Sequence, residues 1–120
     1  MNKATYYKWA DLPQTAMTPQ ISRRLVSGEK MMSVQFTLAK GAVVGQHQHP
    51  HEQITHLISG KIEFEIEGEK RVMESGEVLL IPSNVRHGAV VLEDTVAIEV
   101  FSPPREDFLT DEMPAYMKSQ

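Results

Sequence analysis

Apolar and polar residues alternate with a period of two through most of this 120-residue sequence. In the clearest example, residues 61–67, the apolar residues Ile62, Phe64 and Ile66 alternate with glutamates. Successive side chains of a strand point to opposite faces, so this segment predicts a strand with one buried and one solvated face. Helical periodicity is nearly absent from the chain, which favours an all-β fold.

Turn residues separate the alternating segments from one another. Strands are expected over residues 21–26, 31–39, 61–67, 71–73, 77–81, 88–92 and 95–101. Residues 27–30 predict a hairpin turn between the first two strands, and Glu93-Asp94 separates the last two. Many short strands with turns at close intervals predict a sandwich or a barrel. Residues 102–120 are expected to be a short tail with at most one or two helical turns around residues 107–109.

Length and charge narrow the possible classes of protein further. The chain suits one domain, and no repeat or linker divides residues 1–120. The formal net charge is −4 and no basic stripe is present, so a nucleic-acid partner is not expected. No apolar segment approaches the roughly 20 residues that span a bilayer, and the N-terminus lacks the apolar core of a secretory signal. We therefore expect a cytoplasmic protein without a membrane partner.

Three of the five histidines lie within five residues, at His47, His49 and His51. The chain has no cysteine, so a metal ion would be bound through imidazole, carboxylate or amide oxygen. Residues two apart in a strand share a face, so His47 and His49 can converge on one ion. Gln53 keeps the same parity, whereas the alternative ligand Glu52 points away. The competing interpretation is a histidine-rich loop on the surface.

Residues 41–60 resemble the first sequence motif of the cupins: glycine, five residues, His-x-His, three residues, an acidic ligand, six residues and glycine. Gln53 occupies the acidic position. Residues 76–91 resemble the second motif: glycine, five residues, proline and, five positions later, His87. Asn84 replaces the glycine of this motif, a mild change because asparagine tolerates the left-handed conformation. Val91 replaces its terminal asparagine.

The resemblance to cupins implies both a fold and a cofactor. It implies a single cupin domain over residues 1–120, an all-β, jelly-roll-like barrel (a double-stranded β-helix) of antiparallel strands. It also implies one divalent metal ion, held by His47, His49, Gln53 and His87. The amide of Gln53 carries no charge, so the ion would be a stronger Lewis acid than one neutralised by a carboxylate. Such ligands accept Ni, Zn, Mn, Fe and Co, so the metal is not identified.

A narrower resemblance concerns the segment from Glu99 to Phe108. Together with glutamine as fourth ligand and a single short barrel, it is similar to the pectin-degradation cupins. That family converts 4,5-unsaturated uronate monosaccharides into linear 5-keto-4-deoxyuronates. The resemblance implies that Glu99, Phe101 and Arg105 are catalytic residues near the metal. The family typically has aspartate at the position of Glu99, so the acid here is one methylene longer. The implied protein is a metal-dependent, ring-opening isomerase that acts on a small acidic sugar.

Two other classes of function stay open. One is another metallo-cupin enzyme, such as an iron dioxygenase or a sugar isomerase, and the other is a non-catalytic cupin that binds a small molecule. The candidate residues also have structural interpretations: Glu99 as a surface charge, Phe101 as core packing, and Arg105 as the ion-pair partner of Glu106 or Asp107.

Cupins commonly pair through the outer face of a sheet, which bears on the expected assembly. Ile54 and Ile58 are apolar residues expected on such a face. We therefore expect a homodimer. The remaining histidines, His51 and His56, fit no ligand position of the motifs.

Overall fold

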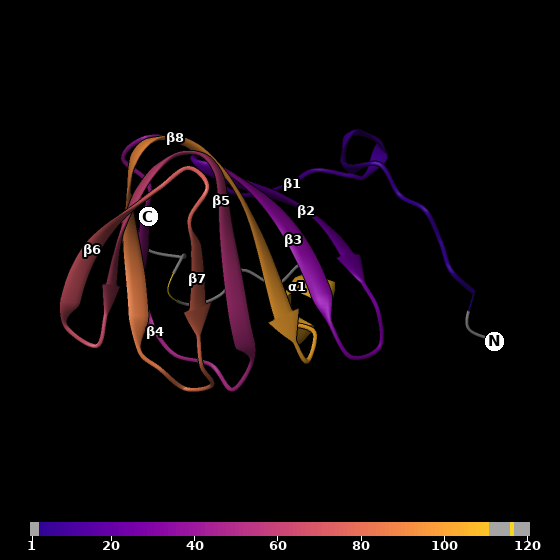
Figure 1. Cartoon of the computed structure of the whole chain (residues 1–120). Coiled ribbons are helices and arrows are strands. Elements are labelled where there is room, and N and C mark those ends of the chain that lie inside the picture. Colours follow the sequence, from indigo (N-terminus) through magenta and orange to yellow (C-terminus); the bar gives the residue numbers. More distant parts are fainter. Residues whose placement is uncertain (1–2, 111–115, 117–120) are drawn as a thin grey trace.

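The computed structural model describes residues 3–110 and residue 116, and these consist mainly of β-strands (Figure 1). The elements are η1 (Trp9–Asp11), β1 (Thr15–Thr18), β2 (Ile21–Ser27), β3 (Met32–Leu38), β4 (Val43–His47), β5 (Glu52–Ile66), β6 (Glu69–Glu74), β7 (Val78–Ile81), β8 (His87–Ser102) and α1 (Glu106–Leu109). Every strand pair is antiparallel. The predicted all-β, antiparallel fold is confirmed. Within these described residues, no helix combines the length and apolar character needed to cross a membrane.

Two long strands, β5 and β8, pair with each other and pass through both layers of the barrel. The first half of β5 pairs with β7 on one side and with the second half of β8 on the other. Beyond β8, the sheet continues with β3, β2 and β1. The second half of β5 pairs with β6 and with the first half of β8, whose other neighbour is β4. We call these the large layer and the small layer. Figure 1 shows how the two long strands curve from one layer to the other.

Gly60 lies where β5 bends between the layers, among shifts in the register of the β5–β8 ladder. Its φ of +96° is a backbone conformation that glycine adopts without strain. A Cβ at this position would collide with the carbonyl oxygen of Asp94 and with Thr95 in β8. The close approach of the two strands at the bend therefore requires glycine, which is the last glycine of the first cupin-like motif.

Apolar side chains of the two layers fill the interior of the barrel. Val34 of the large layer and Ile62 of the small layer are among the buried residues. The alternation in β5 is as predicted, because Ile62 and Phe64 are buried while Glu63 and Glu65 are more accessible. The period-two pattern thus identifies which face of this segment forms the core.

The structure differs from the predicted elements in several places. The strands expected over residues 88–92 and 95–101 are one strand, β8, because Glu93 and Asp94 lie at the bend and the ladder with β5 continues across it. Helix η1, strands β1 and β4 and the first half of β5 (residues 52–60) were not among the predicted elements. In the expected tail, α1 occupies the predicted helical position, and residues 111–115 and 117–120 lie outside the described residues.

Candidate metal centre

Three histidines gather inside one end of the barrel. His47 is the last residue of β4, His87 is the first residue of β8, and the two are paired directly across the ladder. His49 follows just beyond the end of β4. One ligand atom from each of the three residues lies within 4.8 Å of the others. The three-histidine cluster can therefore hold a metal ion.

Each of these imidazoles is oriented by a hydrogen bond from Nδ1 to a backbone carbonyl oxygen. The bonds join His47 to Gly45 (2.7 Å), His87 to Val85 (2.8 Å) and His49 to His51 (3.0 Å). A carbonyl oxygen only accepts hydrogen bonds, so Nδ1 carries the proton and Nε2 keeps its lone pair. This is the arrangement in which neighbouring groups orient the histidine ligands of a metal ion.

Burial keeps the three imidazoles neutral. It lowers the pKa of His47 to about 3 and that of His49 to about 4, and it also lowers the pKa of His87. The Nε2 atom of His49 is buried and has no hydrogen-bond partner among residues 3–110 and 116. A buried, unprotonated nitrogen without a partner is costly unless it binds something, so the site fits a metal ion.

Gln53 lies near the start of β5 and lines the same pocket as His47 and His87. Its Nε2 donates a hydrogen bond of 2.9 Å to Thr55 Oγ1, which leaves the amide oxygen as the atom suited to a metal. Glu52 is exposed, in agreement with the expected direction of its side chain. His47, His49 and Gln53 do not share one strand as predicted, because β4 ends at His47, His49 lies in the following loop and Gln53 belongs to β5.

A chain of hydrogen bonds connects this amide to a carboxyl group. Thr55 Oγ1 donates to Glu99 Oε2 at 2.9 Å, and Thr55 and Glu99 are paired across the β5–β8 ladder. Burial raises the pKa of Glu99 to about 7, while the hydrogen bond from Thr55 and the charge of Arg105 oppose the shift. A carboxyl group with this pKa can both accept and donate a proton near neutral pH.

Arg105 follows β8 and lies buried against two aromatic rings. Its guanidinium carbon is 5.2 Å from the ring centre of Phe101 and 4.3 Å from that of Phe108. Nε and Nη2 donate to the two carboxylate oxygens of Asp107, at 3.1 and 2.9 Å. Nη2 also donates to the hydroxyl of Tyr116 at 2.9 Å. The ion pair with Asp107, one of the structural interpretations of Arg105, is therefore present, and Arg105 lines the pocket as well.

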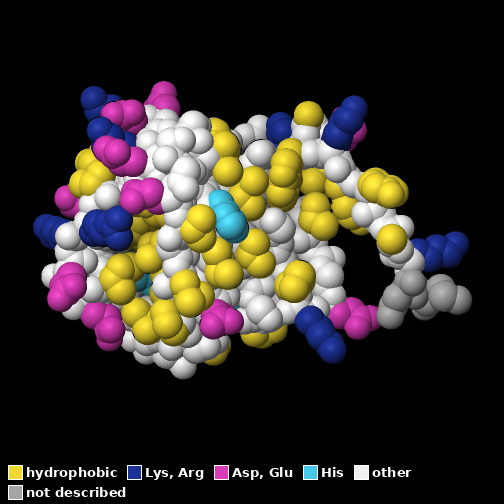
Figure 2. Space-filling view, in the orientation of Figure 1, with side chains coloured by type: hydrophobic (Ala, Val, Ile, Leu, Met, Phe, Trp, Pro, Cys, Tyr) yellow, Lys and Arg dark blue, Asp and Glu magenta, His cyan; other side chains and the backbone are white. Residues whose placement is uncertain are grey.

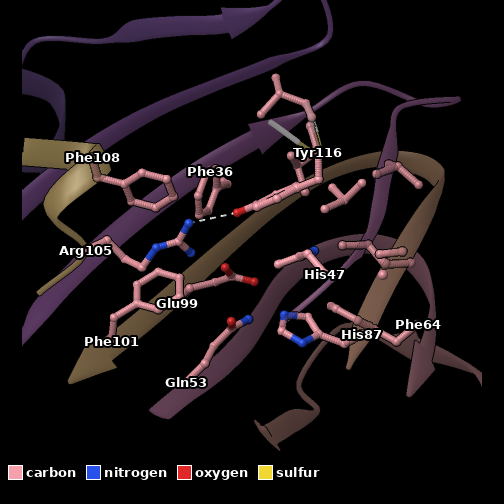
Figure 3. Close-up of a pocket in the computed structure, with 17 residues that line it drawn as sticks. Phe36, His47, Gln53, Phe64, His87, Glu99, Phe101, Arg105, Phe108 and Tyr116 are labelled. Carbon is pink, nitrogen blue, oxygen red and sulfur yellow. Dashed lines mark hydrogen bonds between the residues drawn. The ribbon is translucent and has the colours of Figure 1, made fainter. Parts of the chain in front are cut away.

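A pocket opens between the two layers of the barrel. Figure 3 shows that His47 and His87 lie on one side of it, and that Glu99 and Arg105 lie on the other, with Gln53 between them. Apolar side chains such as Phe64 form much of the remaining wall. A mainly apolar wall with a few convergent polar groups is the character of small-ligand sites in many proteins. The structure thus brings all seven candidate residues to one end of the barrel, and their individual roles remain predictions.

Two residues of the pocket were not found from the sequence. Phe108 packs edge-on against Phe36 and Phe101, and Tyr116 stacks on His47 with ring centres 3.6 Å apart. Both residues follow the last strand, where the period-two pattern has ended, so no periodicity identifies which way they point. Phe108 and Tyr116 are the only aromatic residues of the tail, and this was the available signal.

A two-layer antiparallel barrel with a histidine cluster inside one end defines the class of cupin proteins. The chain belongs to this family, because residues 34–102 match the cupin domain. Asn84, in the glycine position of the second motif, has a φ of +63°, which explains why asparagine is accepted there.

Within the cupins, the chain is a homologue of the pectin degradation protein KdgF. It is 36% identical to KdgF of Dickeya dadantii over 107 residues, which cover 87% of this chain and 97% of the relative. The structure of KdgF from a Halomonas species superimposes with a TM-score of 0.84 at 34% identity, covering 88% of this chain and 99% of that one. An RmlC-like cupin from Shewanella frigidimarina gives a TM-score of 0.83 at 26% identity, covering 88% and 96% of the two chains.

Proposed function

We propose that the protein is a metal-dependent isomerase that opens 4,5-unsaturated uronate monosaccharides, released from pectin or alginate by lyases, to linear 5-keto-4-deoxyuronates. The observation that carries this proposal is the pocket itself. It combines the histidine cluster with a carboxyl group of pKa about 7 and a guanidinium. The similarity to a pectin degradation protein supports this choice of substrate class.

The proposed reaction moves one proton and gains or loses no atoms. The anomeric hydroxyl gives up its proton, its oxygen becomes the aldehyde oxygen, and the bond from C1 to the ring oxygen breaks. The ring oxygen remains on C5 as an enolate, and a proton added to C4 turns this enolate into the ketone. The reaction therefore needs a base near the anomeric hydroxyl, an acid near C4 and stabilisation of negative charge.

Glu99 is our candidate for the group that moves the proton. Its carboxyl group lines the pocket, and its pKa of about 7 leaves both protonation states populated near neutral pH. Thr55 holds one carboxylate oxygen by a hydrogen bond, so the other oxygen is available to a substrate. The carboxylate would accept the proton from the anomeric hydroxyl and the resulting acid would return it to C4.

Binding and charge stabilisation are assigned to the remaining residues. Arg105, held against Phe101, would bind the substrate carboxylate. His47, His49, His87 and Gln53 would hold the divalent ion. When bound, an ion with these neutral ligands supplies a Lewis acid that stabilises negative charge on a substrate oxygen.

The proposal is tested by following the ultraviolet absorbance of the unsaturated uronate. The double bond conjugated to the carboxylate absorbs, and the linear keto product has lost this conjugation. We expect the metal-loaded protein to accelerate the fall in absorbance of unsaturated galacturonate or of its alginate-derived counterpart. Equal decay of both sugars with and without the protein would refute the proposal and favour a dioxygenase or a non-catalytic binding protein.

A Glu99→Gln variant tests the proton shuttle. The amide keeps the shape of the side chain but cannot carry the proton, so kcat should fall by about 10²-fold or more. Glu52→Gln, an exposed residue at the start of β5, is the matched control and should leave kcat unchanged. Metal content is measured in both variants. A Glu99→Gln protein with full metal content and wild-type kcat would exclude Glu99 as the shuttle.

A further inference from the structure

The hydrogen bonds of Arg105 limit how it can bind a carboxylate. A guanidinium has five N–H donors, one on Nε and two on each Nη. In this structure Nε–H and one Nη2–H bind Asp107, and the second Nη2–H binds Tyr116. Among the described residues, only the two Nη1–H groups are left for a ligand. Arg105 alone therefore cannot offer a carboxylate the usual fork of two nitrogens while it keeps these partners.

The hydroxyl of Tyr116 lies where a second donor would be needed. It accepts a hydrogen bond from Arg105, and its own proton has no acceptor among the described residues, so the proton can be donated to a ligand. In Figure 3 this hydroxyl points toward Arg105 and Glu99, on the side of the pocket opposite His87. A carboxylate bound there would receive a hydrogen bond on one oxygen from Arg105 Nη1 and on the other from the phenol.

Two contacts hold the Tyr116 ring in this place. The ring stacks on His47 with an interplanar angle of 7°. The backbone of residue 116 packs on Gly45 of β4, where an added Cβ would be 3.2 Å from the carbonyl oxygen of Tyr116. Tyr116 and Arg105 also line a second cleft on the outer side, so together they form the wall between that cleft and the metal-site pocket.

We propose that Tyr116 is a substrate-binding residue, whose hydroxyl completes with Arg105 Nη1 a two-point site for the carboxylate of an acidic sugar. The inference rests on the proposed function for the identity of the sugar. It assigns the second donor of the clamp to the C-terminal segment and not to the barrel.

Kinetics of a Tyr116→Phe variant on unsaturated galacturonate test the inference. Phenylalanine keeps the stacking on His47 and removes only the hydroxyl. Loss of one hydrogen bond to a charged group should raise KM by roughly 10-fold or more and leave kcat within about twofold. Tyr6→Phe, at a fully exposed tyrosine, is the matched control and should change neither constant.

A double-mutant cycle tests whether the effect of Tyr116 depends on Arg105. In an Arg105→Ala background, removing the Tyr116 hydroxyl should change kcat/KM by less than about threefold, because both groups act on one carboxylate. An unchanged KM in Tyr116→Phe would overturn the inference. So would an equal fall in kcat/KM in the wild-type and Arg105→Ala backgrounds, or a loss of bound metal from Tyr116→Phe. Inactivity of the wild-type protein on uronates would refute the proposed function instead.

Discussion

The three clustered histidines differ from ordinary surface histidines because their Nδ1 protons are held by backbone carbonyls and their rings are buried. Burial removes the hydration that stabilises the imidazolium, so the neutral form persists to lower pH. The low pKa values of His47 and His49, about 3 and about 4, mean that protons compete weakly with a metal ion at this site.

Metal affinity should therefore depend little on pH. A histidine with the ordinary pKa of 6.5 is about 90% protonated at pH 5.5, which would weaken binding about 10-fold for each such ligand. At this site we expect a change of less than about threefold between pH 7.5 and pH 5.5. Competition with a chelator for Zn²⁺, corrected for protonation of the chelator, measures the affinity. A fall of about 100-fold over this range would contradict the neutral state of the cluster.

The ligand set makes a second prediction at this scale. His47→Ala, His49→Ala and His87→Ala should each lose most of the roughly one equivalent of divalent ion expected per chain, because a site with fewer ligands binds weakly. Gln53→Ala should weaken binding less, and Glu52→Ala should have little effect because that side chain is exposed. Elemental analysis after dialysis measures the content. Loss of metal in Glu52→Ala with retention in Gln53→Ala would reverse the assignment.

The candidate ligands could be found from the sequence because their spacing repeats a motif, whereas Tyr116 could not. Glu99 and Phe101 alternate on one strand face, and the resemblance identified them together with Arg105. Tyr116 escaped because its position depends on the contact with Gly45 and on the stacking against His47. Contacts of this kind depend on the complete fold, and no periodic pattern in the sequence predicts them.

Among the elements, β5 and β8 determine the architecture because each takes part in both layers. The sequence pattern identified the buried face in the second half of β5 correctly, but it did not predict residues 52–60 as part of this strand and it divided β8 at Glu93 and Asp94. Polar residues of that kind usually mark a turn. In this structure they occupy a bend within a continuous strand. The local sequence is the same for such a bend as for a hairpin turn, so it does not distinguish them.

The bend itself can be tested at Gly60. Gly60→Ala should lower the free energy of unfolding by more than about 3 kcal/mol, since alanine adds left-handed strain and a collision with Asp94 and Thr95. Gly68→Ala is the control, because Gly68 has a similar φ of +85° but open space around it. It should cost only about 1 kcal/mol. Urea unfolding measures both free energies. Equal losses in the two variants would show that the collision with Asp94 and Thr95 adds nothing to the effect of Gly60→Ala.

For the whole molecule, the outer face of the large layer carries an apolar surface. Ile54 of β5 is paired with Leu80 of β7 on one side and with Val100 of β8 on the other. Val78 and Ile58 are exposed on the same face, at 60% and 50%. Figure 2 shows hydrophobic side chains gathered over this face of the barrel. An apolar surface across three strands, here with His56 among the apolar side chains, is typical of an interface between proteins.

We predict that two copies of the chain associate through this surface. Burial of the apolar side chains would supply the driving force, and a face shared by both copies gives a closed, two-fold dimer. Light scattering at micromolar concentration should give the mass of a dimer. The double variant Ile54→Lys, Ile58→Lys should give a monomer, because it places charges within the apolar surface, and it should retain the metal.

Val43→Lys is the matched control for this prediction, because Val43 is also exposed, at 44%, but lies on β4 of the small layer. It should remain dimeric if the large layer forms the interface. A monomeric wild-type protein would exclude the dimer. If the Val43→Lys variant dissociates while the double lysine variant stays dimeric, the interface lies on the small layer and includes β4, the strand that ends at His47.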